Sequence, residues 1–173
     1  MSTIPNGNLI FAVPKKGRLY ERVLLLLKGA GISFRRKARI DIANSTNMPI
    51  SLLFLNVSDI AVFVAKGSVD LGITGEDMIA ESQSIVKVEL KLNMGQCKLA
   101  LQAPLAVCSK GPAFFAGLRI ATSFPTLTKA YFDKIDGQPE VQYISGSVEA
   151  ACGLGLADAV VDLVETGTTM QAA

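Results

Sequence analysis

The residues best suited to chemistry lie near the end of the chain. An apolar run over residues 159–164 is typical of a buried strand, yet it contains the carboxylate of Asp162. A carboxylate in such a run is costly unless it is paired or accessible to water. Residues 166–169 follow, with three threonines around one glycine. Hydroxyl groups and free N–H groups at a helix start bind phosphate. The segment therefore predicts a ribose-phosphate site, and the alternative is a helix-capping loop without a ligand.

A second candidate site lies near the start of the chain. Lys15, Lys16 and Arg18 surround Gly17, between a strand-like run and a predicted helix. Helix starts favour acidic residues because of the helix dipole, so cations there are unfavourable unless an anion lies opposite. The pattern predicts an anion-binding site, and the alternative is that these side chains extend into solvent. The spacing differs from that of a Walker P-loop.

Two further stretches combine glycine with small polar residues. Gly72 lies within a strand-like run and Gly75 ends it. Glycine inside a strand often marks a close approach of the backbone to a ligand, and the alternative is packing against a helix. Residues 145–149 resemble a helix start that Ser145 or Ser147 caps, which alone indicates a structural role.

The residue types exclude several classes of chemistry. The sequence contains no histidine, and no serine or cysteine lies beside an evident base, so nucleophilic hydrolysis is poorly supported. Cys97, Cys108 and Cys152 are widely spaced, which argues against a zinc site or a disulfide framework and indicates free thiols in a reducing compartment. Catalysis by positioning and charge stabilisation suits these residues better.

The composition is that of a globular protein. Half of the 173 residues are apolar, and the net charge is +2, too small to indicate a nucleic-acid partner. The basic run over residues 35–39 has no interleaved aromatic residues, so it is interpreted as a solvated face, and the alternative is a patch that binds an anion. The N-terminus does not resemble a secretory signal, and no apolar run approaches the roughly 20 residues that span a membrane. We therefore expect a soluble, cytoplasmic protein.

Strand-like and helix-like segments alternate along the chain. The patterns predict strands over residues 9–13, 40–43, 51–55, 69–74, 85–90, 98–103, 118–122, 141–144 and 159–164. They predict helices over residues 17–28, 56–67, 75–81, 126–134 and 147–152, and from about residue 167. This alternation is typical of an α/β fold with mostly parallel sheets and flanking helices.

The order of these elements also predicts where ligands bind. We expect two lobes, over residues 1–94 and 95–173. Several strands end in small or polar residues just before a helix, at positions 74–75, 122–123, 145–147 and 166–169. Ligands bind beyond the carboxyl ends of parallel strands, where helix starts present free N–H groups. Four such ends predict an anion-binding site between the lobes.

Together these stretches resemble the ATP phosphoribosyltransferase family, whose reaction is the first step of histidine biosynthesis. The segments that carry the resemblance keep the family's order and spacing and lie at residues 14–20, 70–75, 95–99, 119–123, 146–149 and 155–169. The doubled lysine and the residues before it are closest to the fungal, long form. The resemblance implies a two-lobed fold like that of type II periplasmic binding proteins. It also implies magnesium as cofactor and a homo-oligomer in the full-length form.

The resemblance further implies a reaction and roles for individual residues. ATP N1 attacks the anomeric carbon of phosphoribosyl diphosphate, and diphosphate leaves. Asp162 and Arg18 would be the catalytic residues. Phosphoribosyl diphosphate would be held by Asp158, Asp162, Glu165, Thr166, Gly167, Thr168 and Thr169. ATP or diphosphate would be held by Lys16, Gly17, Arg18, Asp70, Gly72, Thr74, Gly75 and Glu149. No protein ligand to the metal is predicted.

The sequence departs from the family in length. Family members continue beyond the segment that ends here at Ala173, return to the first lobe and, in long forms, add a domain that binds histidine. We therefore expect a shortened chain whose first lobe lacks part of its sheet. The alternatives to a catalytic chain are a non-catalytic fragment and a two-lobed small-molecule-binding module of the same fold.

Overall fold

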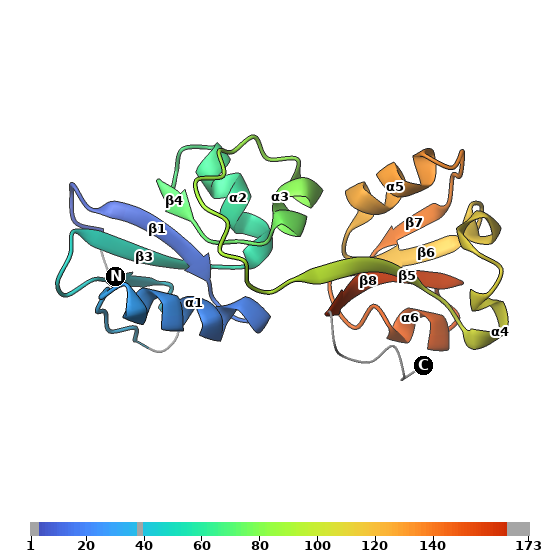
Figure 1. The fold of residues 1–173 in the computed structure, drawn as a ribbon, viewed down its shortest axis with the longest axis horizontal. Helices are drawn as coiled ribbons and strands as arrows, with labels where there is room; N and C mark the ends of the chain where they lie inside the picture. The colour runs from blue at the N-terminus through green and yellow to red at the C-terminus, as the bar shows by residue number, and fades with distance from the viewer. Residues whose placement is uncertain (1–3, 38–39, 166–173) are drawn as a thin grey trace. The chain divides into compact units, whose positions relative to one another are not determined.

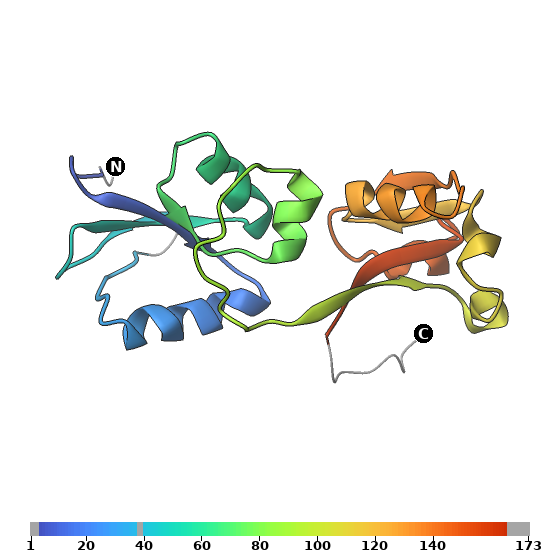
Figure 2. The ribbon, with the colours of Figure 1, turned by 45° about the horizontal axis from the view of Figure 1, so that its top comes forward.

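The computed structural model describes residues 4–37 and 40–165 (Figures 1 and 2). The chain divides into two compact units, Met1–Gly95 and Gln96–Ala173. Each unit contains a four-stranded sheet and its own apolar core. None of the helices in the described ranges has the length and apolar character needed to cross a membrane.

The first unit has three helices and four strands in its described residues. They are β1 (Leu9–Pro14), α1 (Arg18–Gly29), β2 (Ile42–Asn44), β3 (Ile50–Leu55), α2 (Val57–Ala65), β4 (Leu71–Gly72) and α3 (Glu76–Ser82). The strand order is β2-β3-β1-β4. Strand β1 runs parallel to β3 and β4, whereas β2 is antiparallel to β3.

Helices cover both faces of this sheet, which explains why its strands are almost entirely apolar. Side chains alternate between the faces. Val13 packs with Val23 and Leu27 of α1, whereas Ala12 packs with Ile60 of α2. Figure 1 shows α1 and α2 on opposite sides of the sheet.

The second unit repeats this plan with an antiparallel edge. Its elements are β5 (Cys97–Gln102), α4 (Leu105–Cys108), the 3-10 helix η1 (Pro112–Phe115), β6 (Arg119–Thr122), α5 (Pro125–Asp133), β7 (Glu140–Tyr143), α6 (Ala150–Gly153) and β8 (Ala159–Glu165). The strand order is β5-β8-β6-β7. Strand β6 runs parallel to β7 and β8, and β5 is antiparallel to β8.

Two core clusters lie on opposite faces of the second sheet. Ile120 packs with Phe132 of α5, whereas Ala121 packs with Ala151 of α6. Along β8, Val161 belongs to the first cluster and Val160 to the second. The predicted α/β class with mostly parallel sheets is therefore confirmed.

Three sequence predictions differ from the structure. Residues 85–90 are described yet form no strand, and the Ile85 side chain is 95% exposed. Their apolar alternation has no neighbouring strand to pair with in the described part of the chain. The predicted strand over residues 69–74 narrows to the two residues of β4, and the predicted helix over 147–152 narrows to α6. The short helices α4 and η1 were not predicted, and the helix expected from residue 167 lies outside the described residues.

Candidate ligand-binding edges of the two sheets

Asp162 lies at the carboxyl edge of the parallel part of the second sheet. Strand β8 pairs with β6 only as far as Thr122 opposite Val161, so Asp162 is the first residue beyond that ladder. On its other side it still pairs with Ala100 of β5. The alternation along β8 places Asp162 on the face that α6 covers. Its side chain is half-buried, and Oδ1 accepts the N–H of Leu163 at 2.7 Å.

A buried threonine holds the neighbouring strand end in place. The hydroxyl of Thr122 donates to the carbonyl of Val161 at 2.7 Å and accepts the N–H of Phe124 at 2.9 Å. These two bonds join the ends of β6 and β8 and set the turn that leads into α5. The result is an ordered strand end one residue before Asp162, as ligand sites at carboxyl edges require.

The loop after β7 lies over the same face of the sheet. Val148 packs with Val160 of β8, so the loop that ends in α6 covers the side on which Asp162 lies. Glu149, at the start of α6, is exposed. Glu165 is the last residue of β8. Thr166, Gly167, Thr168 and Thr169 lie outside the described residues.

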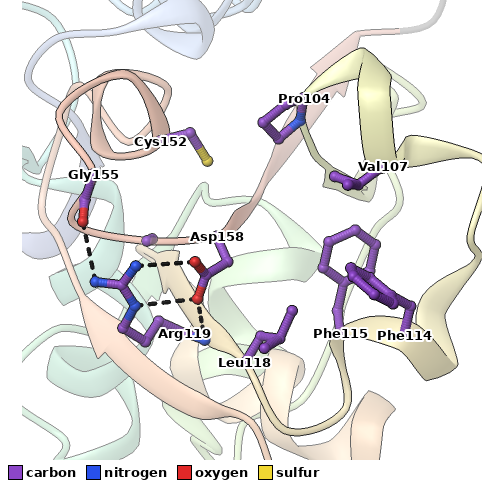
Figure 3. A pocket seen from close by; sticks show the side chains of 10 residues that line it. Pro104, Val107, Phe114, Phe115, Leu118, Arg119, Cys152, Gly155 and Asp158 are labelled. Carbon is purple, nitrogen blue, oxygen red and sulfur yellow. Dashed lines mark hydrogen bonds and ion pairs between the residues drawn. The ribbon is translucent and has the colours of Figure 1, made fainter.

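Asp158 lies just before the amino-terminal end of β8, the strand that carries Asp162. Its carboxylate accepts two bonds from the Arg119 guanidinium, Nη2 to Oδ1 at 2.9 Å and Nε to Oδ2 at 3.1 Å (Figure 3). Oδ2 also accepts the backbone N–H of Arg119 at 3.0 Å. Both kinds of hydrogen bond lower the pKa of Asp158 below its ordinary value. The bonds from the Arg119 side chain have the larger effect on this pKa, and the backbone bond has the next largest. The structure therefore does not bring Asp158 and Asp162 to one edge.

The cationic loop of the first unit occupies the matching carboxyl edge of its sheet. Gly17 precedes α1 at φ 89°, a conformation that only glycine adopts without strain, and no side chain caps the helix. Lys16 is exposed. Arg18 begins the helix, and its Nη2 lies 3.8 Å from Oδ2 of Asp77 in α3. The dipole at the start of α1 and these cations together favour an anion.

The loop after β4 meets the same edge. The Thr74 hydroxyl donates to the carbonyl of Val57 at the start of α2, at 2.9 Å. A Cβ at Gly75 would collide with the Asp77 carboxylate, so Gly75 leaves room for this side chain at the start of α3. The ends of β1, β3 and β4 therefore meet around Lys16, Gly17, Arg18, Thr74 and Gly75.

Asp70 lies away from this edge, and Gly72 ends β4 but packs against α2. The carboxylate of Asp70 accepts the N–H of Ile10 at 2.7 Å, at the start of β1 rather than at its end. Gly72 lies against α2, where a Cβ would come 2.5 Å from Ile60 Cγ2 and 3.2 Å from Val64 Cγ2. This contact supports the packing alternative for Gly72.

Two residues at these positions were not predicted from the sequence. Asp77 approaches Arg18 from α3, and Arg119 fixes Asp158. The acidic pair Glu76 and Asp77 after a glycine is a typical helix start. The sequence therefore indicated that Asp77 stabilises the start of a helix, and not that it pairs with Arg18. Nothing local could have matched Arg119 to a residue 39 positions later.

The described residues contain no group of three or more histidine, cysteine, aspartate or glutamate side chains that could hold a metal ion. Magnesium usually keeps several waters and is held by one or two carboxylates together with substrate phosphates. Asp162 lies at the carboxyl edge of the second sheet and suits this arrangement, in which one carboxylate and the phosphates of a ligand hold the metal.

Comparison with known proteins assigns the family. Residues 56–173 match the family model of ATP phosphoribosyltransferase. The ATP phosphoribosyltransferase of Kluyveromyces lactis is 52% identical over 174 residues, which cover 97% of this chain and 59% of that protein. The ATP phosphoribosyltransferase of Saccharomyces cerevisiae is 47% identical, and the match covers 95% of this chain and 58% of that protein. The chain thus spans about three fifths of the length of these relatives.

A solved structure shows the same fold. The ATP phosphoribosyl transferase (HisG:HisZ) complex from Thermotoga maritima contains a chain that aligns with a TM-score of 0.75 at 30% identity. The alignment covers 92% of this chain and 75% of that one. This likeness supports for the present chain an α/β fold like that of type II periplasmic binding proteins. From the family match, the close relatives and this structure together, the chain belongs to the ATP phosphoribosyltransferase family.

Proposed function

We propose that this chain carries the catalytic part of an ATP phosphoribosyltransferase, which joins N1 of ATP to the anomeric carbon of phosphoribosyl diphosphate in the first step of histidine biosynthesis. The observation that carries the proposal is the position of Asp162. It is the first residue beyond the parallel β6–β8 ladder, within the stretch that matches the family. This position supports a ligand-binding role for Asp162 over the role of a buried structural acid.

The reaction requires positioning and charge stabilisation. ATP N1 forms a bond to the anomeric carbon while the bond from that carbon to the diphosphate oxygen breaks, and diphosphate leaves with the electron pair. Asp162 accepts hydrogen bonds from the ribose hydroxyls and stabilises the positive charge that develops on the sugar. Lys16 and Arg18 stabilise the polyphosphate groups. Such preorganised charges act on the transition state without a proton-transferring histidine.

The remaining predicted contacts differ in their support. The polar loop after β4, with Thr74 and Gly75, supports a role at the polyphosphate edge. Residues 166–169 as the holder of the 5-phosphate, together with Glu165 and Glu149, stay predictions. The bonds that Asp158 and Asp70 make to neighbouring strands support structural roles for those two residues.

Magnesium belongs to the proposal as a partner of the diphosphate. When bound, it neutralises charge on the departing diphosphate. Asp162 is the described carboxylate that would contact it, with the other positions filled by phosphate oxygens and water. We also propose that the full-length protein forms a homo-oligomer.

The experiment that tests the proposal compares two aspartate variants of the second unit. Asp162→Asn should abolish most of the melting-temperature increase that phosphoribosyl diphosphate with magnesium produces, and should lower phosphoribosyl-ATP formation by about 100-fold or more. Asp136→Asn is the matched control, because Asp136 is exposed in a turn with φ 53°, which asparagine adopts readily.

Three outcomes separate the alternatives. A thermal shift that survives in Asp162→Asn contradicts the role of this residue. Binding of phosphoribosyl diphosphate without product formation, in a chain extended to the length of the relatives, favours the small-molecule-binding module. Absence of binding in both lengths favours the non-catalytic fragment.

A further inference from the structure

A carboxylate lies among the cations at the carboxyl edge of the first sheet. Asp77 is the second residue of α3, and its Oδ2 lies 3.8 Å from Nη2 of Arg18 at the start of α1. The side chain of Asp77 is only 17% exposed, whereas that of its neighbour Glu76 is 69% exposed. Asp77 is therefore enclosed beside Arg18, and Glu76 extends into solvent.

The negative charge of Asp77 is unfavourable for the ligand proposed at this edge. Like charges at close range repel, so Asp77 opposes the polyphosphate that Lys16 and Arg18 are proposed to bind. A carboxylate in the first turn of a helix is favourable, but Glu76 also supplies one to α3. An exposed carboxylate would serve the helix dipole equally well. The enclosed position of Asp77 is therefore better explained by its contact with Arg18.

The backbone before α3 makes room for the Asp77 carboxylate. Gly75 has φ -76°, a conformation open to any residue, yet a Cβ there would collide with Asp77. Glycine at this position thus provides space and not a special backbone angle. The Gly75 carbonyl accepts the N–H of Met78 at 3.1 Å, and the Thr74 hydroxyl donates to the carbonyl of Val57 at 2.9 Å. These bonds fix the backbone from which Asp77 reaches Arg18.

The side chain of Arg18 needs such a restraint more than its backbone does. The next residue, Leu19, packs against Gly95, where a Cβ would come 2.6 Å from Leu19 Cδ2, so the first turn of α1 is held in place. An arginine side chain has more rotamer freedom than most others. The distance of 3.8 Å to Asp77 is too long for a hydrogen bond, so Asp77 attracts the guanidinium by charge. This attraction limits the positions that the guanidinium takes.

We propose that Asp77 is a positioning residue, which holds the Arg18 guanidinium where it meets the polyphosphate of ATP. The inference rests on the proposed function, because ATP is the anion that Arg18 binds there. A cation that is already in place loses less conformational freedom on binding, and it stabilises developing charge without reorganising. We expect this gain to exceed the repulsion between Asp77 and the polyphosphate.

Calorimetric titration with ATP tests the proposal, because charge and position predict opposite results. Asp77→Asn removes a negative charge, so charge alone predicts tighter binding, whereas loss of positioning predicts binding about three- to fivefold weaker. Gly75→Ala keeps the charge but displaces the carboxylate, and it should weaken binding to a similar extent. Glu76→Gln is the matched control. It removes the same charge from an exposed neighbour, whose Oε1 lies 3.0 Å from Nζ of Lys91, and it should not weaken binding.

A double-mutant cycle with Arg18→Ala separates positioning from a structural role. If Asp77 acts through Arg18, Asp77→Asn should not weaken ATP binding in the Arg18→Ala background, where only the effect of its charge is left. A purely structural role predicts the same loss in both backgrounds, and that result overturns the proposal. Unchanged or tighter binding of ATP by Asp77→Asn alone also overturns it.

Folding and the proposed function are checked separately. Circular dichroism and melting temperature identify any variant that fails to fold. If Asp77→Asn is such a variant, the same cycle is run with Gly75→Ala, which requires only the end of the Asp77 side chain to shift. A chain that binds ATP but forms no phosphoribosyl-ATP contradicts the catalytic function, and the cycle still decides the role of Asp77. Absence of ATP binding by the unmodified chain contradicts both proposals.

Discussion

Asp70 and Asp158 make the same pair of bonds in the two units. Each carboxylate accepts a backbone N–H at or near the start of the adjacent parallel strand, from Ile10 in one unit and from Arg119 in the other. The N–H of each aspartate in turn donates to the carbonyl of that same residue. Both aspartates thus fix the register of a parallel strand pair at its amino-terminal end.

The ion pair of Asp158 predicts a pH-dependent loss of stability. Hydrogen bonds from Arg119 lower the pKa of Asp158 in the folded chain relative to the unfolded chain. Its contribution is therefore present above the unfolded pKa of about 3.9 and is lost as pH falls through the lower folded pKa. Asp158→Asn should lower the melting temperature at pH 7, and the difference from the unmodified chain should shrink towards pH 2 to 3.

Thermal melts at several pH values check this prediction. Asp133→Asn, at an exposed position of α5, serves as the control. A difference between Asp158→Asn and the unmodified chain that is constant from pH 7 to about pH 2.5 would rule out the ion pair as its source.

Gly72 packs so closely against α2 that a larger residue there should destabilise the protein, whereas Gly153 has free space around it. Gly72→Ala brings a methyl group against Ile60 Cγ2, and Ile60 is fully buried and cannot move aside freely. The free energy of unfolding should fall by about 1–3 kcal/mol. Gly153→Ala in α6 has open space around it and should be neutral or slightly stabilising. Urea unfolding measures both, and equal effects would contradict the packing role.

At the scale of elements, the position of Arg18 at the start of α1 predicts that its removal weakens the binding of ATP more than the binding of phosphoribosyl diphosphate. Arg18→Ala removes a cation from a helix start that has no side-chain cap, so ATP should bind about tenfold more weakly while phosphoribosyl diphosphate loses less. Arg22→Ala, one turn later on the same helix, is the control. Calorimetry that finds equal losses for both ligands would contradict the assignment of Arg18 to ATP.

Most elements could be predicted because their signals are local. Apolar runs between turn residues identified β1, β3 and β6, and the apolar face of residues 17–28 identified α1. Residues 85–90 also have a strand-like pattern, in which apolar and polar residues alternate, but the described part of the structure gives them no partner strand. A strand depends on its partner as much as on its own residues. The orientation of the edge strands β2 and β5 likewise follows from long-range pairing.

The residues of the candidate site could be predicted only where the signal was local. Residue types near strand ends identified Arg18, Thr74 and Asp162, which lie at carboxyl edges. Asp70 and Asp158 lie in similar motifs, but strand register places them at the amino-terminal ends, where they bond to backbone 60 and 39 residues away. Register depends on pairing between distant segments, so a local pattern could not separate the two groups.

At the scale of the whole molecule, the two units have separate cores. A core substitution in one unit should therefore destabilise that unit and leave the stability of the other unchanged. Leu52 is fully buried in the first unit, so Leu52→Ala should destabilise that unit by about 2–5 kcal/mol. Native-state hydrogen exchange should show faster exchange of the protected amides of β1 and β3. The amides of β6 and β8, around a different core, should keep their protection. Equal acceleration in both units would show that they unfold together.

The paired aspartate bonds at the strand starts have a consequence for how such a scaffold can diversify. Asp70 and Asp158 hold one end of each sheet in register, and the candidate ligand-binding groups lie at the other end. Substitutions of the exposed residues in the loops after β1 and β7 should therefore change recognition with little risk to folding. A library randomised in those loops should yield far more folded variants than one randomised around Asp70 and Asp158, which makes this arrangement a favourable starting point for new ligand specificities.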